Sequence, residues 1–176
     1  MTAEKKKRKR ITLVTGANMG LGFETCRQLA QLGYTVILTA RDFTKGEIAA
    51  NQLIERGLDV IFYELDVSNQ SHMDRIAHQI EQQFGQLDVL VNNAAILYDT
   101  WQNAVNADLE VINQALRTNL LGPWKLSQVC IPLMKKNGYL ESCHQLNPNN
   151  GIKQLENQQN PCLLDVYIKG NVVDDC

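Results

Sequence analysis

The stretch Thr15-Gly16-Ala17-Asn18-Met19-Gly20-Leu21-Gly22 decides the fold of this chain. It follows a short apolar run at residues 11–14, which predicts a buried strand, and it opens a helical pattern. Glycines at such a junction let the backbone approach a ligand closely, because side chains would block the approach. The N–H groups and positive dipole end of the following helix favour a phosphate. The sequence therefore predicts a strand–turn–helix unit that holds a dinucleotide pyrophosphate.

Strand and helix patterns alternate beyond this unit. Runs such as VILTA and LDVLV are apolar on both faces, which is typical of a parallel sheet covered by helices. Ser71 is expected to open a helix, with Asp74 completing a capping box. The alternation predicts an α/β fold with right-handed crossovers. The expected strands are 34–39, 60–65 and 87–91, and the expected helices are 21–32, 45–56, 71–84 and 104–136.

The last of these helical stretches contains Gly122-Pro123. Proline lacks the N–H that a helix interior needs and clashes with the preceding turn. The helix is therefore expected to bend or break at that point.

Composition places the chain among soluble globular domains. It has 176 residues, 44% of them hydrophobic and 20% charged, and a net charge of −2. Residues 5–10 are all basic, a pattern typical either of nuclear import and nucleic-acid contact or of a solvated arm. Nothing else in the sequence favours a nucleic-acid partner, so we predict a disordered arm at residues 1–10. No apolar run approaches the roughly 18 residues of a membrane span, and no membrane partner is predicted.

The five cysteines show no paired spacing, which favours a reducing, cytoplasmic setting. Cys143-His144 supplies only two candidate metal ligands, so no metal site is predicted. After Gly138 the composition changes, and residues 145–160 are crowded with Asn and Gln. We predict three regions: the arm at 1–10, a dinucleotide-binding domain at 11–138, and a tail at 139–176 that is largely loop.

A second candidate binding position follows the strand predicted at 34–39. An acidic residue at this strand tip would normally hold the ribose diol of a dinucleotide. Arg41 stands there instead, and an arginine pairs with a 2′-phosphate that a carboxylate would repel. The sequence therefore predicts NADP(H) rather than NAD(H). The neighbouring Asp42 is a carboxylate that leaves NAD(H) open as an alternative. A second alternative is that Arg41 is exposed and binds no cofactor.

Together these motifs resemble the classical short-chain dehydrogenase/reductase family, in its carbonyl-reductase-like branch. The resemblance covers residues 11–138, roughly the first half of a usual member. It implies a Rossmann-type doubly wound parallel sheet, incomplete here, with strand order 3-2-1-4 and one option of a further strand from Cys162–Ile168. The open sheet edge is a candidate contact for a second copy or a full-length relative. The matching segments are residues 15–22, 39–42, 65–67, 91–95 and 119–123.

The resemblance also implies roles for individual residues. The glycine-rich turn would line the pyrophosphate, Arg41 would meet the adenosine phosphate, and Asp66 would accept from the adenine amino group. Asn119 would bend its helix and anchor a proton-relay water. Ala95 stands where the family usually has glycine. The implied cofactor-binding residues are Gly16, Asn18, Met19, Gly20, Leu21, Gly22, Arg41, Asp66, Val67, Asn93 and Ala94.

The family's proton donor is not found. Members use Tyr-x-x-x-Lys, in which the lysine lowers the pKa of the tyrosine, together with an upstream serine. Four residues past the five tyrosines stand Leu38, Val67, Gln102, Cys143 and Asn171. The sequence thus predicts an NADP(H)-binding oxidoreductase of this type with impaired carbonyl reduction. The alternatives are a catalytically silent cofactor-binding or interaction module, or a truncated product. Codons can be chosen for residues 140–145 such that a shifted reading frame encodes a peptide resembling the next strand of the family. A frameshift or an alternative splice is therefore one hypothesis for the origin of the tail.

Overall fold

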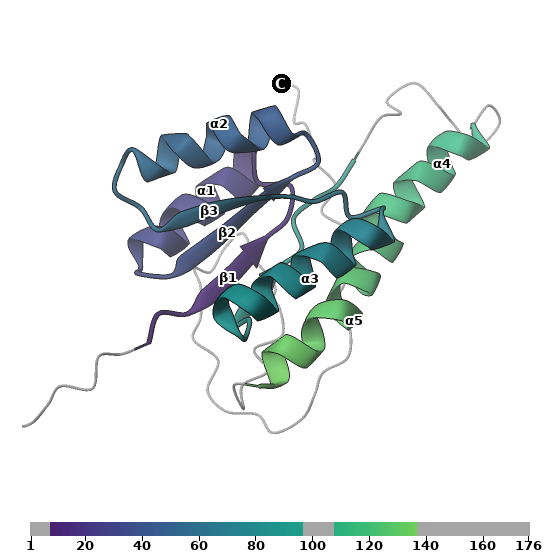
Figure 1. Ribbon diagram of the computed structural model, residues 1–176. Helices are drawn as coiled ribbons and strands as arrows, with labels where there is room; N and C mark the ends of the chain where they lie inside the picture. Colours follow the sequence, from purple (N-terminus) through teal and green to yellow (C-terminus); the bar gives the residue numbers. More distant parts are fainter. Residues whose placement is uncertain (1–7, 97–107, 137–176) are drawn as a thin grey trace, which may run out of the picture.

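Four parallel strands form the centre of the molecule (Figure 1). The structure is a computed structural model, and it describes residues 8–96 and 108–136. The sheet order is β3-β2-β1-β4, as the family resemblance implied. The strands are β1 Ile11–Val14, β2 Thr35–Ala40, β3 Val60–Glu64 and β4 Val89–Val91.

Helices cover both faces of this sheet (Figure 1). One face carries α1, Gly20–Gln31, and α2, Phe43–Ile54. The opposite face carries α3, Gln70–Phe84, and α5, Gly122–Lys135. The predicted α/β architecture is therefore confirmed. Because helices cover both faces, β1 and β2 are buried along their whole length.

Two apolar cores result from the alternation of side chains along each strand. Leu13 and Ile37 point into the core under α3 and α5. Val14 and Leu38 point the other way, into the core under α1 and α2. Successive side chains of a strand lie on opposite faces of the sheet, so neighbouring residues of β1 supply different cores.

Two helix starts differ from the sequence prediction. Asn69, not Ser71, caps α3, because the Asn69 side chain accepts a hydrogen bond from the Ser71 N–H at 3.0 Å. Asp74 accepts from Gln70 Nε2 at 3.0 Å and completes no capping box. Helix α2 begins at Phe43, two residues before the predicted start, because Asp42 caps it. Several side chains in each segment are able to cap, and only the folded backbone selects one.

The predicted long helix divides into three segments. Helix α4 covers Leu109–Leu116, a π-helical turn η1 covers Arg117–Leu121, and α5 begins at Gly122 with Pro123 in its first turn. The Gly122 N–H donates to the Arg117 carbonyl, five residues back. The break expected at Gly122-Pro123 is therefore a widened turn just before the proline, which places the proline where no N–H is needed.

The basic residues at the start of the described chain lie against the sheet. Arg8 pairs with Asp88 at 2.7 Å, and Lys9 pairs with Asp59 at 2.8 Å. The first part of the predicted arm, the start of the predicted helix at 104–107 and the whole predicted tail lie outside the described residues. In the part of the chain that the structure describes, none of the helices has the length and apolar character needed to cross a membrane.

Candidate cofactor-binding site

The predicted site segments all meet at one edge of the sheet. Val14, at the end of β1, is in register with Leu38 of β2 and with Val91 of β4. Ala40, at the end of β2, is in register with Glu64 of β3. In a parallel sheet these carboxyl ends share one edge, which is where ligands bind in open α/β folds. The turn at 15–22, Arg41, the loop at 65–67 and the loop at 92–96 therefore lie along one rim.

The glycine-rich turn is held too tightly to accept side chains at two of its positions. A Cβ atom at Gly16 would lie 2.8 Å from Ala94 Cα, and the backbone there has φ +61°. A Cβ atom at Gly22 would clash with Asn93 Nδ2. These glycines are needed because the turn packs directly on the loop after β4.

Asn93 ties this turn to the neighbouring strand. Its side-chain Nδ2 donates to the carbonyls of Thr15 at 2.9 Å and Gly16 at 3.0 Å. In return, Thr15 Oγ1 accepts from the backbone N–H of Asn93 at 2.9 Å and of Ala94 at 3.0 Å. Ala17 N–H donates to the Thr39 carbonyl at 2.7 Å. The turn is thus fixed from both sides before any ligand arrives, which lowers the cost of ordering it on binding.

The start of α1 differs from the starts of α2, α3 and α4, and α5, which also lacks a side-chain cap, continues directly from η1. Asp42, Asn69 and Asp108 each cap their helices with a side-chain hydrogen bond. Helix α1 has no side-chain cap and no acidic residue in its first turn. The backbone N–H groups of a first turn have no partner inside the helix. They are the groups that a phosphate oxygen satisfies.

Space for a ligand exists beside this helix start. Gly20 has φ +61°, and a Cβ atom built there would meet nothing within 4 Å. Met19 and Leu21 are 72% and 57% exposed and flank the glycine. Asn18 is partly buried in the same turn. The residues present therefore fit the pyrophosphate of a dinucleotide: an open backbone surface, uncapped N–H groups and apolar borders.

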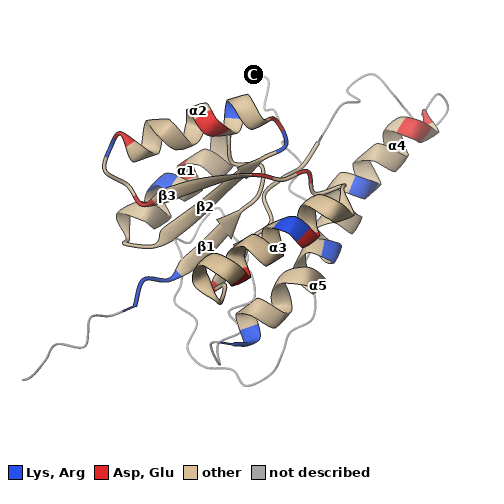
Figure 2. Ribbon diagram, viewed as in Figure 1, with Lys and Arg blue, Asp and Glu red and all other residues tan. Residues whose placement is uncertain are grey.

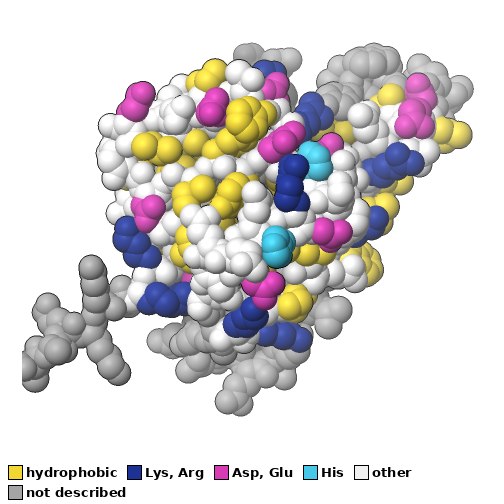
Figure 3. All heavy atoms as spheres, viewed as in Figure 1, with side chains coloured by type: hydrophobic (Ala, Val, Ile, Leu, Met, Phe, Trp, Pro, Cys, Tyr) yellow, Lys and Arg dark blue, Asp and Glu magenta, His cyan; other side chains and the backbone are white. Residues whose placement is uncertain are grey.

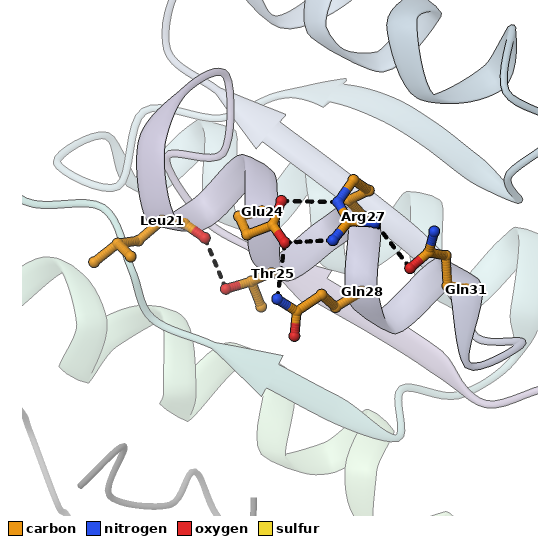
Figure 4. A network of polar contacts seen from close by, with 6 residues as sticks. All are labelled: Leu21, Glu24, Thr25, Arg27, Gln28 and Gln31. Carbon is orange, nitrogen blue, oxygen red and sulfur yellow. Dashed lines mark hydrogen bonds and ion pairs between the residues drawn. The ribbon is translucent and has the colours of Figure 1, made fainter. Parts of the chain in front are cut away.

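The first carboxylate of α1, that of Glu24, is paired with side chains of the same helix (Figure 4). Glu24 accepts from Arg27 Nε at 2.8 Å and from Gln28 Nε2 at 2.8 Å. These hydrogen bonds lower the pKa of Glu24 to about 2, so the group stays ionised and paired. Its charge is directed along the helix surface toward Arg27 and opposes an anion at the turn less than a lone carboxylate would.

Arg41 follows β2 directly and is exposed. Its neighbour Asp42 accepts from the Lys45 backbone N–H at 3.0 Å and lies 3.5 Å from Lys45 Nζ. The backbone hydrogen bond from Lys45 lowers the pKa of Asp42. The carboxylate that left the choice of cofactor open in the sequence is therefore the cap of α2.

The loop after β3 is shaped by its own hydrogen bonds. Asp66 Oδ1 accepts from the Ser68 N–H at 2.8 Å and from Ser68 Oγ at 2.7 Å, and the Asp66 N–H donates to His72 Nδ1 at 3.3 Å. Val67 is buried, and its carbonyl would lie 2.6 Å from a Cβ atom at Gly122. The predicted adenine contacts thus lie in a loop fixed against α5.

Asn119 lies in η1 and holds the end of the loop after β4. Its Oδ1 accepts from the Ile96 N–H, and its Nδ2 donates to the Ile96 carbonyl, both at 2.8 Å. Asn92 reaches α5 instead, where its Nδ2 donates to Ser127 Oγ at 3.3 Å. The predicted bend at Asn119 coincides with the π-helical turn, while its relay role stays a prediction. The sequence did not identify its partner, because Ile96 is far away along the chain.

Comparison with known proteins identifies the family. The sequence profile described as short chain dehydrogenase matches residues 10–139, most of the chain.

This chain belongs to the short-chain dehydrogenase family.

Its similarity to individual members agrees with the predicted carbonyl-reductase-like branch. The chain is 33% identical over 186 residues to (+)-neomenthol dehydrogenase of Arabidopsis thaliana, covering 94% of this chain and 60% of the relative. It is 34% identical over 173 residues to carbonyl reductase (NADPH) 3 of Rattus norvegicus, with the same coverage of 94% and 60%.

Solved structures of the short-chain dehydrogenase family show the same fold. Salutaridine reductase from Papaver somniferum matches with a TM-score of 0.65 and 31% identity, over 73% of this chain and 54% of that one. A metagenomic short-chain oxidoreductase in complex with NADP matches with a TM-score of 0.68 and 27% identity, over 73% and 57%. This chain therefore spans somewhat more than half the length of the members it matches.

Proposed function

We propose that this chain binds NADP(H) at the carboxyl edge of its sheet. The observation that carries the proposal is the start of α1, which lacks the side-chain cap that α2, α3 and α4 possess. The turn before it is held open by Asn93 and Thr15, with free space beside Gly20. A pyrophosphate placed there would accept from the uncapped N–H groups and gain from the helix dipole.

The choice of NADP(H) over NAD(H) rests on Arg41. Its guanidinium follows the strand tip where a ribose diol would otherwise meet a carboxylate. Asp42 is engaged with Lys45 as a helix cap, which supports Arg41 as the residue that would meet the 2′-phosphate. The name of the rat relative includes NADPH, and the metagenomic relative was solved with NADP.

We further propose that the chain as it stands holds the cofactor without steady-state carbonyl reduction. When bound, the nicotinamide would supply a hydride, and Asn119 would hold the loop beside it through Ile96. No tyrosine of this sequence has a lysine four residues later, so the family's proton donor has no equivalent in it. Reduction of ketones or aldehydes is the activity we propose for a complete protein that contains such a donor.

A second candidate function is an interaction module that binds the cofactor but is catalytically silent. The observation that favours it is β4, which is the terminal strand of the described sheet and pairs there with β1 alone. Such an edge is a template for a further strand, from this chain, a second copy or a full-length relative. We place any of these in a reducing, cytoplasmic setting, because Cys26 and Cys130 are both buried free thiols.

Fluorescence titration with NADPH and NADH tests the cofactor proposal. We expect NADPH to bind more tightly, and Arg41→Ala to weaken NADPH binding by about 10- to 100-fold, the value of one or two charge-assisted hydrogen bonds, while NADH binding changes little. Arg56→Ala, just beyond the other end of α2, is the matched control and should change neither.

Three results would contradict parts of this proposal separately. Equal binding of NADH and NADPH would remove the role of Arg41. A folded chain that binds neither nucleotide would remove the cofactor site. Steady-state oxidation of NADPH that depends on an added ketone or aldehyde would show that the chain contains a proton donor of another kind.

A further inference from the structure

The loop between β3 and α3 holds Asp66 through most of its polar atoms. The Asp66 backbone N–H donates to His72 Nδ1 at 3.3 Å, and its carbonyl oxygen accepts from the Asn69 N–H at 3.0 Å. In the side chain, Oδ1 accepts from the Ser68 N–H at 2.8 Å and from Ser68 Oγ at 2.7 Å. The Asp66 carboxylate is therefore held in place by its neighbours in the chain, which is the support that a precise binding site requires.

One oxygen of this carboxylate, Oδ2, takes no part in these contacts. Within the described residues, 8–96 and 108–136, no group donates a hydrogen bond to it. Asp66 is only partly buried, so its side chain stays accessible to a ligand. An ionised carboxylate accepts hydrogen bonds and donates none. The group that Oδ2 would bind is therefore a hydrogen-bond donor.

The order of the strands indicates which part of a nucleotide comes near Asp66. The strands run β3-β2-β1 across the sheet, so the turn after β1, Arg41 after β2 and Asp66 after β3 follow one another along its carboxyl edge. Figure 2 shows basic and acidic residues along this edge, where β2 and β3 end. The proposed function, on which this inference rests, places the pyrophosphate at the turn and the 2′-phosphate near Arg41. The base is bonded to that same ribose, so it would lie at the loop of Asp66.

The base of NADP(H) is adenine, whose 6-amino group is a hydrogen-bond donor. Oδ2 of Asp66 would accept from that group in a charge-assisted hydrogen bond. Hypoxanthine, the 6-oxo analogue of adenine, presents an acceptor oxygen at the same place, and the carboxylate would repel it. A carboxylate that rotates freely would turn away and discriminate less. Selection between the two bases therefore depends on what holds Asp66.

We propose that His72 and Ser68 are positioning residues that hold Asp66 for recognition of the adenine base. Ser68 occupies Oδ1, which leaves Oδ2 as the oxygen that meets the 6-amino group. His72 lies in the first turn of α3, so its bond to the Asp66 N–H ties the loop to a helix that packs on the core. Both side chains act through Asp66.

The first experiment determines the tautomer of the His72 ring. Because Nδ1 accepts from a backbone N–H, the neutral ring must carry its proton on Nε2. Long-range proton–nitrogen NMR of the chain without nucleotide, in mildly alkaline solution, reports the position of this proton. Figure 3 shows histidine side chains over α3 at the surface of the molecule. His78, which is exposed on the same helix, supplies the comparison and should show a mixture of the two tautomers.

The second experiment compares the binding of NADPH with that of its hypoxanthine analogue, followed by nicotinamide fluorescence. The two nucleotides differ only around position 6 of the purine, so the ratio of their dissociation constants isolates that contact. The ratio is measured on one preparation and does not depend on the fraction of the chain that is folded. The unaltered chain should prefer NADPH by about tenfold or more, as expected for a hydrogen bond to a charged group.

Four variants separate positioning from general stability. His72→Leu should lower the preference to about threefold or less, mainly by weakening the binding of NADPH. His72→Asn should retain it, because the amide oxygen of asparagine takes the place of the Nδ1 acceptor. Ser68→Ala, which keeps the Ser68 N–H, should lower the preference part of the way. His78→Leu is the matched control on the same helix and should leave it unchanged.

The proposal is overturned by a ring proton on Nδ1 of His72, by equal binding of the two nucleotides, or by a preference that survives His72→Leu. A preference lost equally in His72→Leu and His72→Asn would show that the ring acts only by packing, and it also overturns the proposal. In the results that concern preference the chain still binds nucleotide, so the cofactor site stands and base recognition alone fails. A folded chain that binds neither nucleotide removes the cofactor site, and this inference with it.

Discussion

The contact between Gly22 and Asn93 predicts that substitutions at these two positions are coupled. A Cβ atom at Gly22 would clash with Asn93 Nδ2 and would lie 2.9 Å from Ala17 Cα. Cβ atoms in proteins essentially never approach other atoms closer than 3.0 Å, so Gly22→Ala must displace the Asn93 side chain. That side chain makes the two hydrogen bonds to the Thr15 and Gly16 carbonyls that hold the turn.

The structure sets the expected magnitudes. Asn93→Ala removes two hydrogen bonds of about 1 kcal/mol each, which lowers the free energy of unfolding by about 2 kcal/mol. Gly22→Ala loses the same bonds and adds crowding against Ala17 of about 1 kcal/mol, for a loss of about 3 kcal/mol. In the double variant the bonds are lost only once. Its loss should therefore be about 3 kcal/mol rather than the additive value of about 5 kcal/mol.

Urea unfolding followed by circular dichroism measures all four corners of this cycle. A control cycle pairs Gly22→Ala with Gln128→Ala, a position on α5, and its two effects should add within about 0.5 kcal/mol. If the losses in unfolding free energy of Gly22→Ala and Asn93→Ala also add, the reasoning is refuted. Additivity would mean that the added methyl group leaves the hydrogen bonds of Asn93 in place.

Three further outcomes are expected. Gly122→Ala should lower the free energy of unfolding by about 1–3 kcal/mol, because its Cβ atom would lie 2.6 Å from the Val67 carbonyl oxygen, a backbone atom. An unchanged urea midpoint would contradict this packing. Glu24→Gln should flatten the dependence of stability on pH between about 4.5 and 2. Since hydrogen bonds with Arg27 and Gln28 lower the folded pKa of Glu24 to about 2, the stabilisation is complete above the unfolded pKa of 4.5 and is lost as the pH falls through the folded value; identical acid unfolding curves would count against the ion pair. Asn119→Ala should speed amide exchange at Ile96, whose N–H donates to the Asn119 side chain, more than it lowers global stability; unaltered exchange there would exclude the contact.

Much of the fold was predictable because it is encoded over short distances. The period of apolar residues distinguishes buried strands from helices, and the family resemblance supplied the order in which the strands pair. Helix ends were harder to place. Asn69 and Ser71 are both good caps in sequence, and only the hydrogen bond that forms shows that Asn69 is the one used. A proline indicates a break in a helix but does not say that a π-helical turn will absorb it.

The candidate site divides in the same way. The glycine-rich turn and Arg41 are visible in the sequence because a phosphate site needs open backbone and a cation after consecutive parallel strands. What holds that site was not visible: the hydrogen bonds from Asn93 cross more than seventy positions of the chain. The residues around an asparagine that follows a strand do not indicate which distant residue it will bind.

By itself, the sequence determined the alternation of strands and helices and the chemistry of the turn at residues 15–22, because period, glycine placement and charge act between near neighbours. Only the tertiary structure decided that Asp42 serves α2 and that Asn93 fixes the turn. It alone also left the apolar side of α4 facing outward. Each of these depends on which surfaces come together when the sheet closes against its helices, and that is set by contacts between segments far apart in the chain.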